Sequence, residues 1–229
     1  MKIAFISDIH SNSLGLKTVL NSIGAVDAMY CVGDITGYYP FPNEAIEELK
    51  AKNIISVMGN HDKYLLQNFA SETANEQVLE SVEFTKKIIS EESLSYLRSL
   101  PEKLELVIDG KKVLMCHGSP WDNLEERIYP DFDNFEKFES VEQNIIILGH
   151  THYPMVVEIG GKKIINPGSC GQPRDYNLLS YVIWDTKTDE FEIKRVEWDI
   201  EKFKKEALEK GTDPKLFEVF NRVQHKQSQ

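Results

Sequence analysis

Short apolar runs alternate with helix-like segments over the first third of the chain. Their residue types predict strands at 2–7, 27–32 and 54–58, separated by helices at 14–22 and 43–51. Strands that alternate with helices are typical of βαβ units, in which neighbouring strands run parallel. Parallel strands end at the same edge of their sheet, so the residues that follow them come together there.

The second half of the sequence is richer in hairpin patterns. Asp109-Gly110 and Gly160-Gly161 each separate two apolar runs, as is typical of hairpins with tight turns. Residues 178–184 and 190–198 predict a third antiparallel pair. The chain is therefore expected to be an α/β protein in which two sheets pack face to face, with helices outside.

Helical segments surround these strands. Asn43, after a proline, is the predicted N-cap of its helix. The polar segment 63–100, with a new helix start at Ser90, predicts a helical insertion or cap, and a plain pair of surface helices is the alternative. Residues 200–229 predict a C-terminal helical closure. No linker-like stretch divides the chain, so we expect a single domain over 1–229.

Histidine is concentrated beside aspartate, asparagine and glycine. Five of the six histidines lie in such clusters, each after an apolar run, and only His225 stands apart. The mixture of imidazole, carboxylate and amide ligands favours transition metals over magnesium or calcium, which prefer oxygen ligands alone. The clusters are Asp8-Ile9-His10, Gly33-Asp34, Gly59-Asn60-His61-Asp62, His117-Gly118 and Gly149-His150-Thr151-His152.

The order of these clusters resembles that of the calcineurin-like binuclear metallophosphoesterase family, over about residues 1–185. The later Asn166-Pro167-Gly168-Ser169 run is similar to a loop of its small prokaryotic members. The resemblance implies a four-layer α/β/β/α sandwich of two packed mixed β-sheets with flanking helices. It also implies two divalent transition-metal ions, with manganese first and iron, zinc, nickel or cobalt as alternatives.

The resemblance further implies a role for each matching residue. Asp34 matches a metal-bridging aspartate, and His61 matches a general acid that contacts the phosphate and is not a ligand. The implied reaction is hydrolysis of small-molecule phosphomonoesters or phosphodiesters by a metal-bridging hydroxide. The implied ligands are Asp8, His10 and His152 for one metal and Asn60, His117 and His150 for the other.

Two further residues are candidate substrate ligands. Asn12 lies close enough to the first cluster to bind a phosphate oxygen, and a helix cap is the competing interpretation. The planar fork of Arg174 is suited to a phosphate, and a surface salt bridge is its alternative.

The pattern of phosphoprotein phosphatases of this family breaks after Asp34. Gly37 stands where those enzymes carry an aspartate that pairs with the catalytic histidine, and Tyr38 stands where they carry an arginine. A dedicated phosphoserine/threonine phosphatase is therefore disfavoured.

The composition of the chain limits which kinds of partner and compartment we expect. The 26 basic residues against 37 acidic ones give a net charge of −11, so we expect no nucleic-acid partner. No apolar run is long enough to span a membrane, and the odd count of three cysteines fits a reducing cytoplasm. A homodimer is an open expectation.

Two other functions compete with a general phosphoesterase. One is a nucleotide-specific hydrolase, acting on a cyclic nucleotide or a dinucleoside polyphosphate. Aromatic side chains near the pocket would favour it, and Tyr38, Tyr39 and Trp121 are the candidates. The other is a non-catalytic scaffold with the same fold, which the complete set of ligand positions disfavours.

Overall fold

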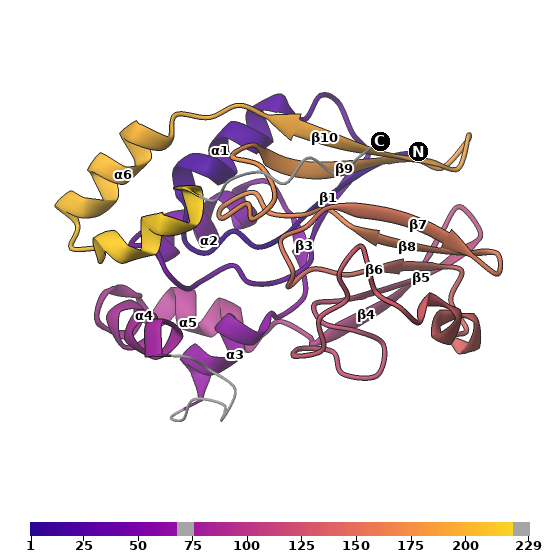
Figure 1. The fold of residues 1–229 in the computed structure, drawn as a ribbon, viewed down its shortest axis with the longest axis horizontal. Coiled ribbons are helices and arrows are strands. Elements are labelled where there is room, and N and C mark those ends of the chain that lie inside the picture. The colour runs from indigo at the N-terminus through magenta and orange to yellow at the C-terminus, as the bar shows by residue number, and fades with distance from the viewer. Residues whose placement is uncertain (68–75, 222–229) are drawn as a thin grey trace.

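The computed structural model describes residues 1–67 and 76–221 and contains two β-sheets with helices beside them (Figure 1). His225 and parts of the predicted helical segments 63–100 and 200–229 lie outside the described residues. Within these ranges, no helix is both long and apolar enough to cross a membrane.

The first sheet places parallel strands beside an antiparallel pair. β1, β2 and β3 are parallel, and β9 is antiparallel to both β1 and β10. In spatial order its strands are β10 (Glu190–Val196), β9 (Leu179–Asp185), β1 (Lys2–Ile6), β2 (Ala28–Cys31) and β3 (Ile55–Ser56).

The second sheet is also mixed. Its three central strands are parallel, and both edge strands are antiparallel to their neighbours. In spatial order they are β4 (Lys103–Ile108), β5 (Lys111–Cys116), β6 (Ile145–Ile147), β8 (Lys162–Asn166) and β7 (Met155–Ile159).

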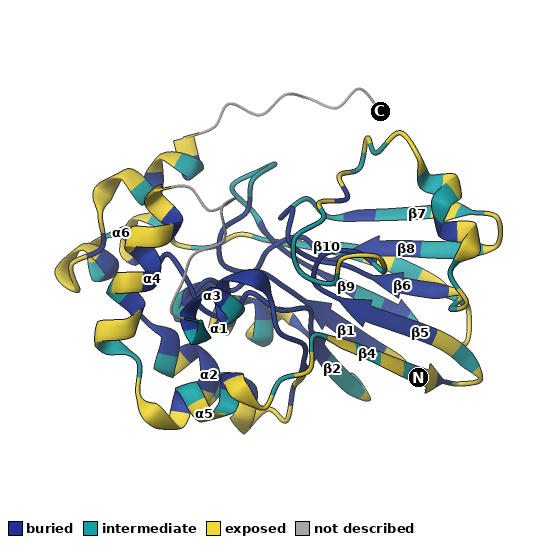
Figure 2. Cartoon of the chain, turned by 90° about the horizontal axis from the view of Figure 1, so that it is seen from below, coloured by how far each residue is buried: buried dark blue, intermediate teal, exposed yellow. Residues whose placement is uncertain are grey.

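The apolar core follows the two-residue period of the strands. On β1, Ile3 and Phe5 pack between the sheets, whereas Ala4 and Ile6 pack against the helices. On β5 the same alternation sends Val113 and Met115 inward and Leu114 and Cys116 to the outer side. Figure 2 shows many strand residues buried, whereas the helices beside the strands carry more exposed residues. The predicted sandwich of two mixed sheets is therefore confirmed.

All α-helices lie to the left of the strands in Figure 1. The outer side of the second sheet is instead covered by the 3₁₀ helix η1 (Phe135–Ser140) and its flanking loops, with Phe138 fully buried. The helices are α1 (Ser13–Ser22), α2 (Pro42–Ala51), α3 (Asn60–Leu66), α4 (Glu76–Ile88), α5 (Glu91–Arg98), α6 (Ile200–Glu209) and the 3₁₀ helix η2 (Pro214–Asn221).

Local patterns predicted most boundaries. Both predicted hairpin turns have positive φ at their two central residues, and Ser90 caps α5 as expected. The predicted N-cap at Asn43 is wrong, because α2 begins at Pro42 after Phe41. The Asn43 amide instead donates to the Ile88 carbonyl and accepts from the Ser90 amide, joining α2 to the α4–α5 junction.

Candidate metal centre

The strand ends bring the polar clusters together. β1 and β2 pair with Ile6 opposite Cys31, and beyond them the Asp8 amide donates to the Gly33 carbonyl. In the other sheet, the Gly149 amide donates to the His117 carbonyl just beyond β5 and β6. The His117 Nδ1 lies 2.7 Å from the Val32 carbonyl, so clusters from both sheets meet at one edge of the sandwich.

Seven predicted ligand positions are buried at this edge. Asp34 belongs to both of two groups whose ligand atoms lie within 4.8 Å of one another. One group is Asp8, His10, Asp34 and His152, and the other is Asp34, His117 and His150.

The Asp34 carboxylate lies between the two groups. Its Oδ2 is 3.5 Å from His10 Nε2 and 3.2 Å from His117 Nε2. Its Oδ1 accepts a hydrogen bond of 2.9 Å from the His61 backbone amide. The Asn60 Oδ1 lies 3.2 Å from His117 Nε2, so the predicted amide ligand adjoins the second group.

Backbone carbonyls orient the imidazoles. The Nδ1 atoms of His10, His117 and His152 lie 3.2, 2.7 and 2.6 Å from carbonyls of Thr36, Val32 and Gln172. An Nδ1–H that donates to these carbonyls leaves Nε2 as the ligand atom. The His150 ring has the opposite orientation. Its Nε2 lies 3.1 Å from the Glu125 carbonyl, so its Nδ1 is the atom available to bind a cation.

The donor set fits a cation. The Nε2 atoms of His10 and His152 lie only 3.0 Å apart, although both are acceptors in the orientation just described. Both oxygens of the buried Asp8 carboxylate have no hydrogen-bond partner among the described residues. Acceptors gathered in this way, out of water, are stabilised by a positive charge between them.

Burial and the histidines set the protonation of the carboxylates. Burial opposes ionisation of Asp34, but the neighbouring imidazoles, His117 foremost, hold its pKa well below the usual range. Burial raises the pKa of Asp8 to about 7. Burial alone would lower the pKa of His117, but the neighbouring Asp34 carboxylate raises it to about 9. Burial lowers the pKa values of His10 and His152, so both imidazoles are neutral.

The ligand loops adopt an uncommon backbone. Five predicted ligand residues have positive φ, between 49° and 68°. Such residues cluster at functional sites, where the surrounding structure stabilises them. The five are Asp8, His10, Asp34, His150 and His152.

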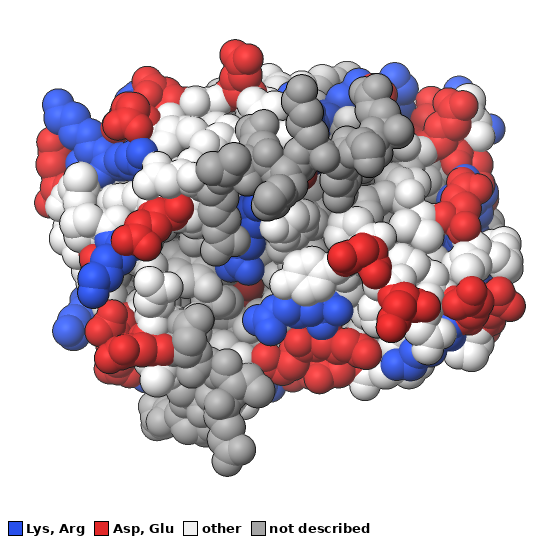
Figure 3. All heavy atoms as spheres, in the orientation of Figure 1, with Lys and Arg blue, Asp and Glu red and all other residues white. Residues whose placement is uncertain are grey.

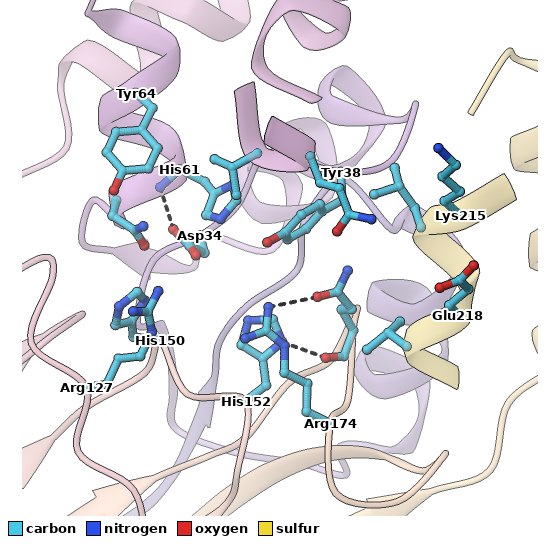
Figure 4. Close-up of a pocket in the computed structure, with 16 residues that line it drawn as sticks. Asp34, Tyr38, His61, Tyr64, Arg127, His150, His152, Arg174, Lys215 and Glu218 are labelled. Atoms are coloured by element: carbon cyan, nitrogen blue, oxygen red, sulfur yellow. Dashed lines mark hydrogen bonds between the residues drawn. The ribbon is translucent and has the colours of Figure 1, made fainter. Parts of the chain in front are cut away.

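A cavity of about 380 Å³ opens above the ligand groups (Figure 4). Asp34, His150 and His152 lie at one end, and Lys215 and Glu218 of η2 lie at the other. Arg127 and Arg174 also line the cavity and bring two cations close to the ligands.

The family model described as a calcineurin-like phosphoesterase superfamily domain matches residues 1–189 of the chain. The chain belongs to this superfamily. The prediction of the family is therefore confirmed.

Similar proteins cover nearly the whole chain. Protein MJ0912 of Methanocaldococcus jannaschii is 40% identical over 220 residues, which cover 87% of this chain and 89% of that protein. A metallophosphoesterase from Sphaerobacter thermophilus is 31% identical, with a TM-score of 0.83 and coverage of 96% and 98%. Protein PH1004 from Pyrococcus horikoshii shares the fold at 20% identity, with a TM-score of 0.87 and coverage of 96% and 97%.

His61 lines the cavity, and no carboxylate among the described residues accepts a hydrogen bond from its ring. Its Nδ1 has no hydrogen-bond partner among the described residues, and an added Cβ at Gly37 would come within 2.7 Å of it. The adjacent Asp62 carboxylate instead accepts from the amides of Ile35, Thr36 and Gly59. Burial lowers the pKa of His61 to about 4, so the free side chain is a neutral imidazole.

The two predicted substrate ligands differ in position. Asn12 caps α1 by accepting from the Gly15 amide, and its Nδ2 donates to the Gly171 carbonyl. Phosphate binding by Asn12 stays a prediction without a supporting contact, since Asn12 is not among the residues that line the cavity. Arg174 lines the cavity and donates from Nη2 to Gln172 Oε1, and the described residues include no carboxylate in an ion pair with it.

Other aromatic candidates fall in different places. Tyr38 lines the cavity, whereas Tyr39 is fully buried against Phe203 of α6. Trp121 is outside the cavity lining, with Lys137 above its ring. Sequence reasoning missed Arg127, which lies in an irregular loop where only its charge marks it.

Proposed function

We propose that the protein is a metal-dependent phosphoesterase that hydrolyses phosphomonoesters or phosphodiesters of small molecules. The observation that carries the proposal is the pair of ligand groups sharing Asp34 at one end of a cavity lined by arginines. Asp8, His10 and His152 would hold one divalent transition-metal ion, and Asn60, His117 and His150 the other. Manganese is the first candidate, with iron, zinc, nickel and cobalt as alternatives.

When bound, two such ions would polarise the phosphoryl group and lower the pKa of water to supply a nucleophile. The chain's own residues prepare the site for this chemistry. Carbonyls fix the histidine rings, and the Asp34 carboxylate, which is held ionised, supplies negative charge to both groups. This preorganisation lowers the cost of rearranging polar groups during reaction.

Arg127 and Arg174 would bind the phosphate oxygens. Two guanidinium groups beside one cavity contrast with the net charge of −11 for the chain. On the face shown in Figure 3, lysine and arginine side chains lie in separate groups among acidic ones. This distribution favours a small anionic substrate that can enter the cavity. It disfavours an extended polyanion, which the acidic surface would repel.

His61 is the proposed general acid. Its pKa of about 4 in the free protein would rise when a phosphate dianion binds beside it, because an opposite charge favours the imidazolium. The protonated ring would then donate its proton to the leaving-group oxygen.

The deciding experiment begins with protein stripped of metal by a chelator. Manganese, nickel, zinc or magnesium is then added separately, and hydrolysis of p-nitrophenyl phosphate and bis-p-nitrophenyl phosphate is measured. We expect transition metals to restore turnover, and the two substrates to rank monoesters against diesters. Protein that binds two ions and yet hydrolyses neither substrate with any metal would contradict the proposed activity on simple esters.

A further inference from the structure

A second cavity of about 180 Å³ adjoins the cavity of about 380 Å³ beside the ligand groups, which is called the metal cavity below. It lies between α4 and the segment that connects α6 to η2, and Gly211, Thr212 and Asp213 form one of its walls. Tyr38, Gln77 and Leu216 line both cavities. These three residues therefore lie at the boundary between the two cavities.

The walls of the second cavity suit a flat ring. Phe84 of α4 is half-buried and is not among the residues that form or pack against the apolar core, although Val78 and Val82 of the same helix are. The Tyr38 ring lies beside the candidate metal centre, with its centroid 4.7 Å from those of His10 and His61. Two aromatic side chains, Tyr38 and Phe84, thus line the second cavity.

Polar groups at this cavity supply hydrogen bonds. The Thr212 hydroxyl is buried, with 4% of the residue exposed, and has no hydrogen-bond partner among the described residues. The exposed residues Glu80 and Asp213 add carboxylate acceptors to the lining. A buried hydroxyl without a partner costs free energy unless a ligand satisfies it.

We propose that the second cavity binds the base of a nucleotide whose phosphate lies in the metal cavity. This assignment rests on the proposed function, because it places the scissile phosphate at the metal centre. A nucleobase has an aromatic face for Phe84, ring acceptors for the Thr212 hydroxyl and, in adenine, an exocyclic amino group for the carboxylates. A saturated alcohol or sugar would leave the aromatic contact unused.

The test compares AMP with ribose 5-phosphate, which carries a hydroxyl in place of the base. The ratio of their kcat/KM values is measured with metal-loaded protein, or the ratio of their Kd values by calorimetry if neither is hydrolysed. Stacking on one aromatic side chain predicts a preference of about tenfold or more for AMP. A ratio near one in the wild-type protein would overturn the base site.

Matched variants test the assigned residues. Phe84→Ala and Thr212→Val should each reduce the AMP preference severalfold. Leu79→Ala, an exposed change on the same helix, and Thr188→Val, an exposed threonine change elsewhere, should retain it. An unchanged preference in both cavity variants, with native thermal stability, would refute the proposed contacts.

The outcomes separate the base site from the catalytic proposal. Hydrolysis of both compounds without preference would refute the base site and support the phosphoesterase. A preference in binding without hydrolysis, even with other metals and esters, would support the base site and refute the phosphoesterase.

Discussion

Asp34 is shared by both ligand groups, so the loss of its charge should affect both metals. Asp34→Asn keeps an oxygen that can accept from the His61 amide but removes the negative charge. We expect lower metal content and a loss of turnover greater than about 100-fold, since changes to residues that merely support ligands cost about 10- to 100-fold. Elemental analysis and p-nitrophenyl phosphate hydrolysis provide the measurements. Asp131→Asn, at an exposed position, is the control.

His61 differs from the ligands because it lines the cavity without belonging to either group. His61→Ala should retain its metals and lose on the order of 100-fold in kcat for phenyl phosphate, whose leaving group needs a proton. The loss should be much smaller for p-nitrophenyl phosphate, whose leaving group departs as an anion. Equal losses for the two substrates would contradict the general-acid role.

Metal loading should depend on pH through Asp8 and His117. In the metal-free protein their pKa values are raised, to about 7 and about 9, so both groups gain protons as the pH falls. Metal binding requires the deprotonated forms and should release these protons. We therefore expect affinity to fall between pH 9 and pH 6, measured by calorimetry in buffers of different ionisation enthalpy. Affinity that is constant over this range would contradict the assignment of both residues as ligands.

At the scale of elements, Asn43 joins α2 to the α4–α5 junction by two hydrogen bonds. Asn43→Ala should reduce the free energy of unfolding by about 1–3 kcal/mol, because each lost bond contributes about 0.5–1.5 kcal/mol. Urea denaturation measures this change. Asn21→Ala, on the exposed face of α1, should have little effect, and equal losses in the two variants would argue against the bridging role.

Elements with local determinants were predictable from sequence. Asp109-Gly110 and Gly160-Gly161 define their hairpins because the turn itself requires positive φ at two successive residues. The N-cap prediction at Asn43 was wrong because its contacts are not local. The Asn43 side-chain amide forms hydrogen bonds with backbone groups 45 and 47 positions away in sequence. The cover of the second sheet by η1 depends on Phe138 and its neighbours in three dimensions, which no short pattern reveals.

In the candidate site, too, residues with local sequence signals were predicted, and residues placed by tertiary packing were not. The ligand clusters were found because each follows a strand, and topology alone brings strand ends together. Arg127 and Phe84 were missed because they reach the cavities from a loop and a helix whose packing the sequence pattern does not fix. Tyr38 was recognised as a candidate only through its position four residues after Asp34.

At the scale of the whole molecule, the two ligand groups draw residues from both sheets. Asp8 and Asp34 follow strands of the first sheet, and His117 and His150 follow strands of the second. Bound metal should therefore resist separation of the sheets. At about 100 times Kd, one ion contributes about 2.7 kcal/mol, which corresponds to about 5–11 °C in Tm for a chain of this size.

Differential scanning calorimetry before and after chelation measures this stabilisation. Readdition of the metal should restore the higher Tm. The same treatment should leave the Tm of His150→Ala less affected, since that variant lacks a ligand from the second sheet. An unchanged Tm in fully loaded wild-type protein would contradict the proposed link between the sheets.

The left-handed backbone at five predicted ligand positions also restricts the evolution of the site. Aspartate, asparagine and histidine bind metals, and they are also the residue types other than glycine that most readily adopt positive φ. Coordination chemistry and backbone conformation thus select the same small set of residues. A lineage that abandoned metal binding would still be held to asparagine, aspartate, histidine or glycine at these positions. Ancestral ligands could therefore outlast the activity that first required them.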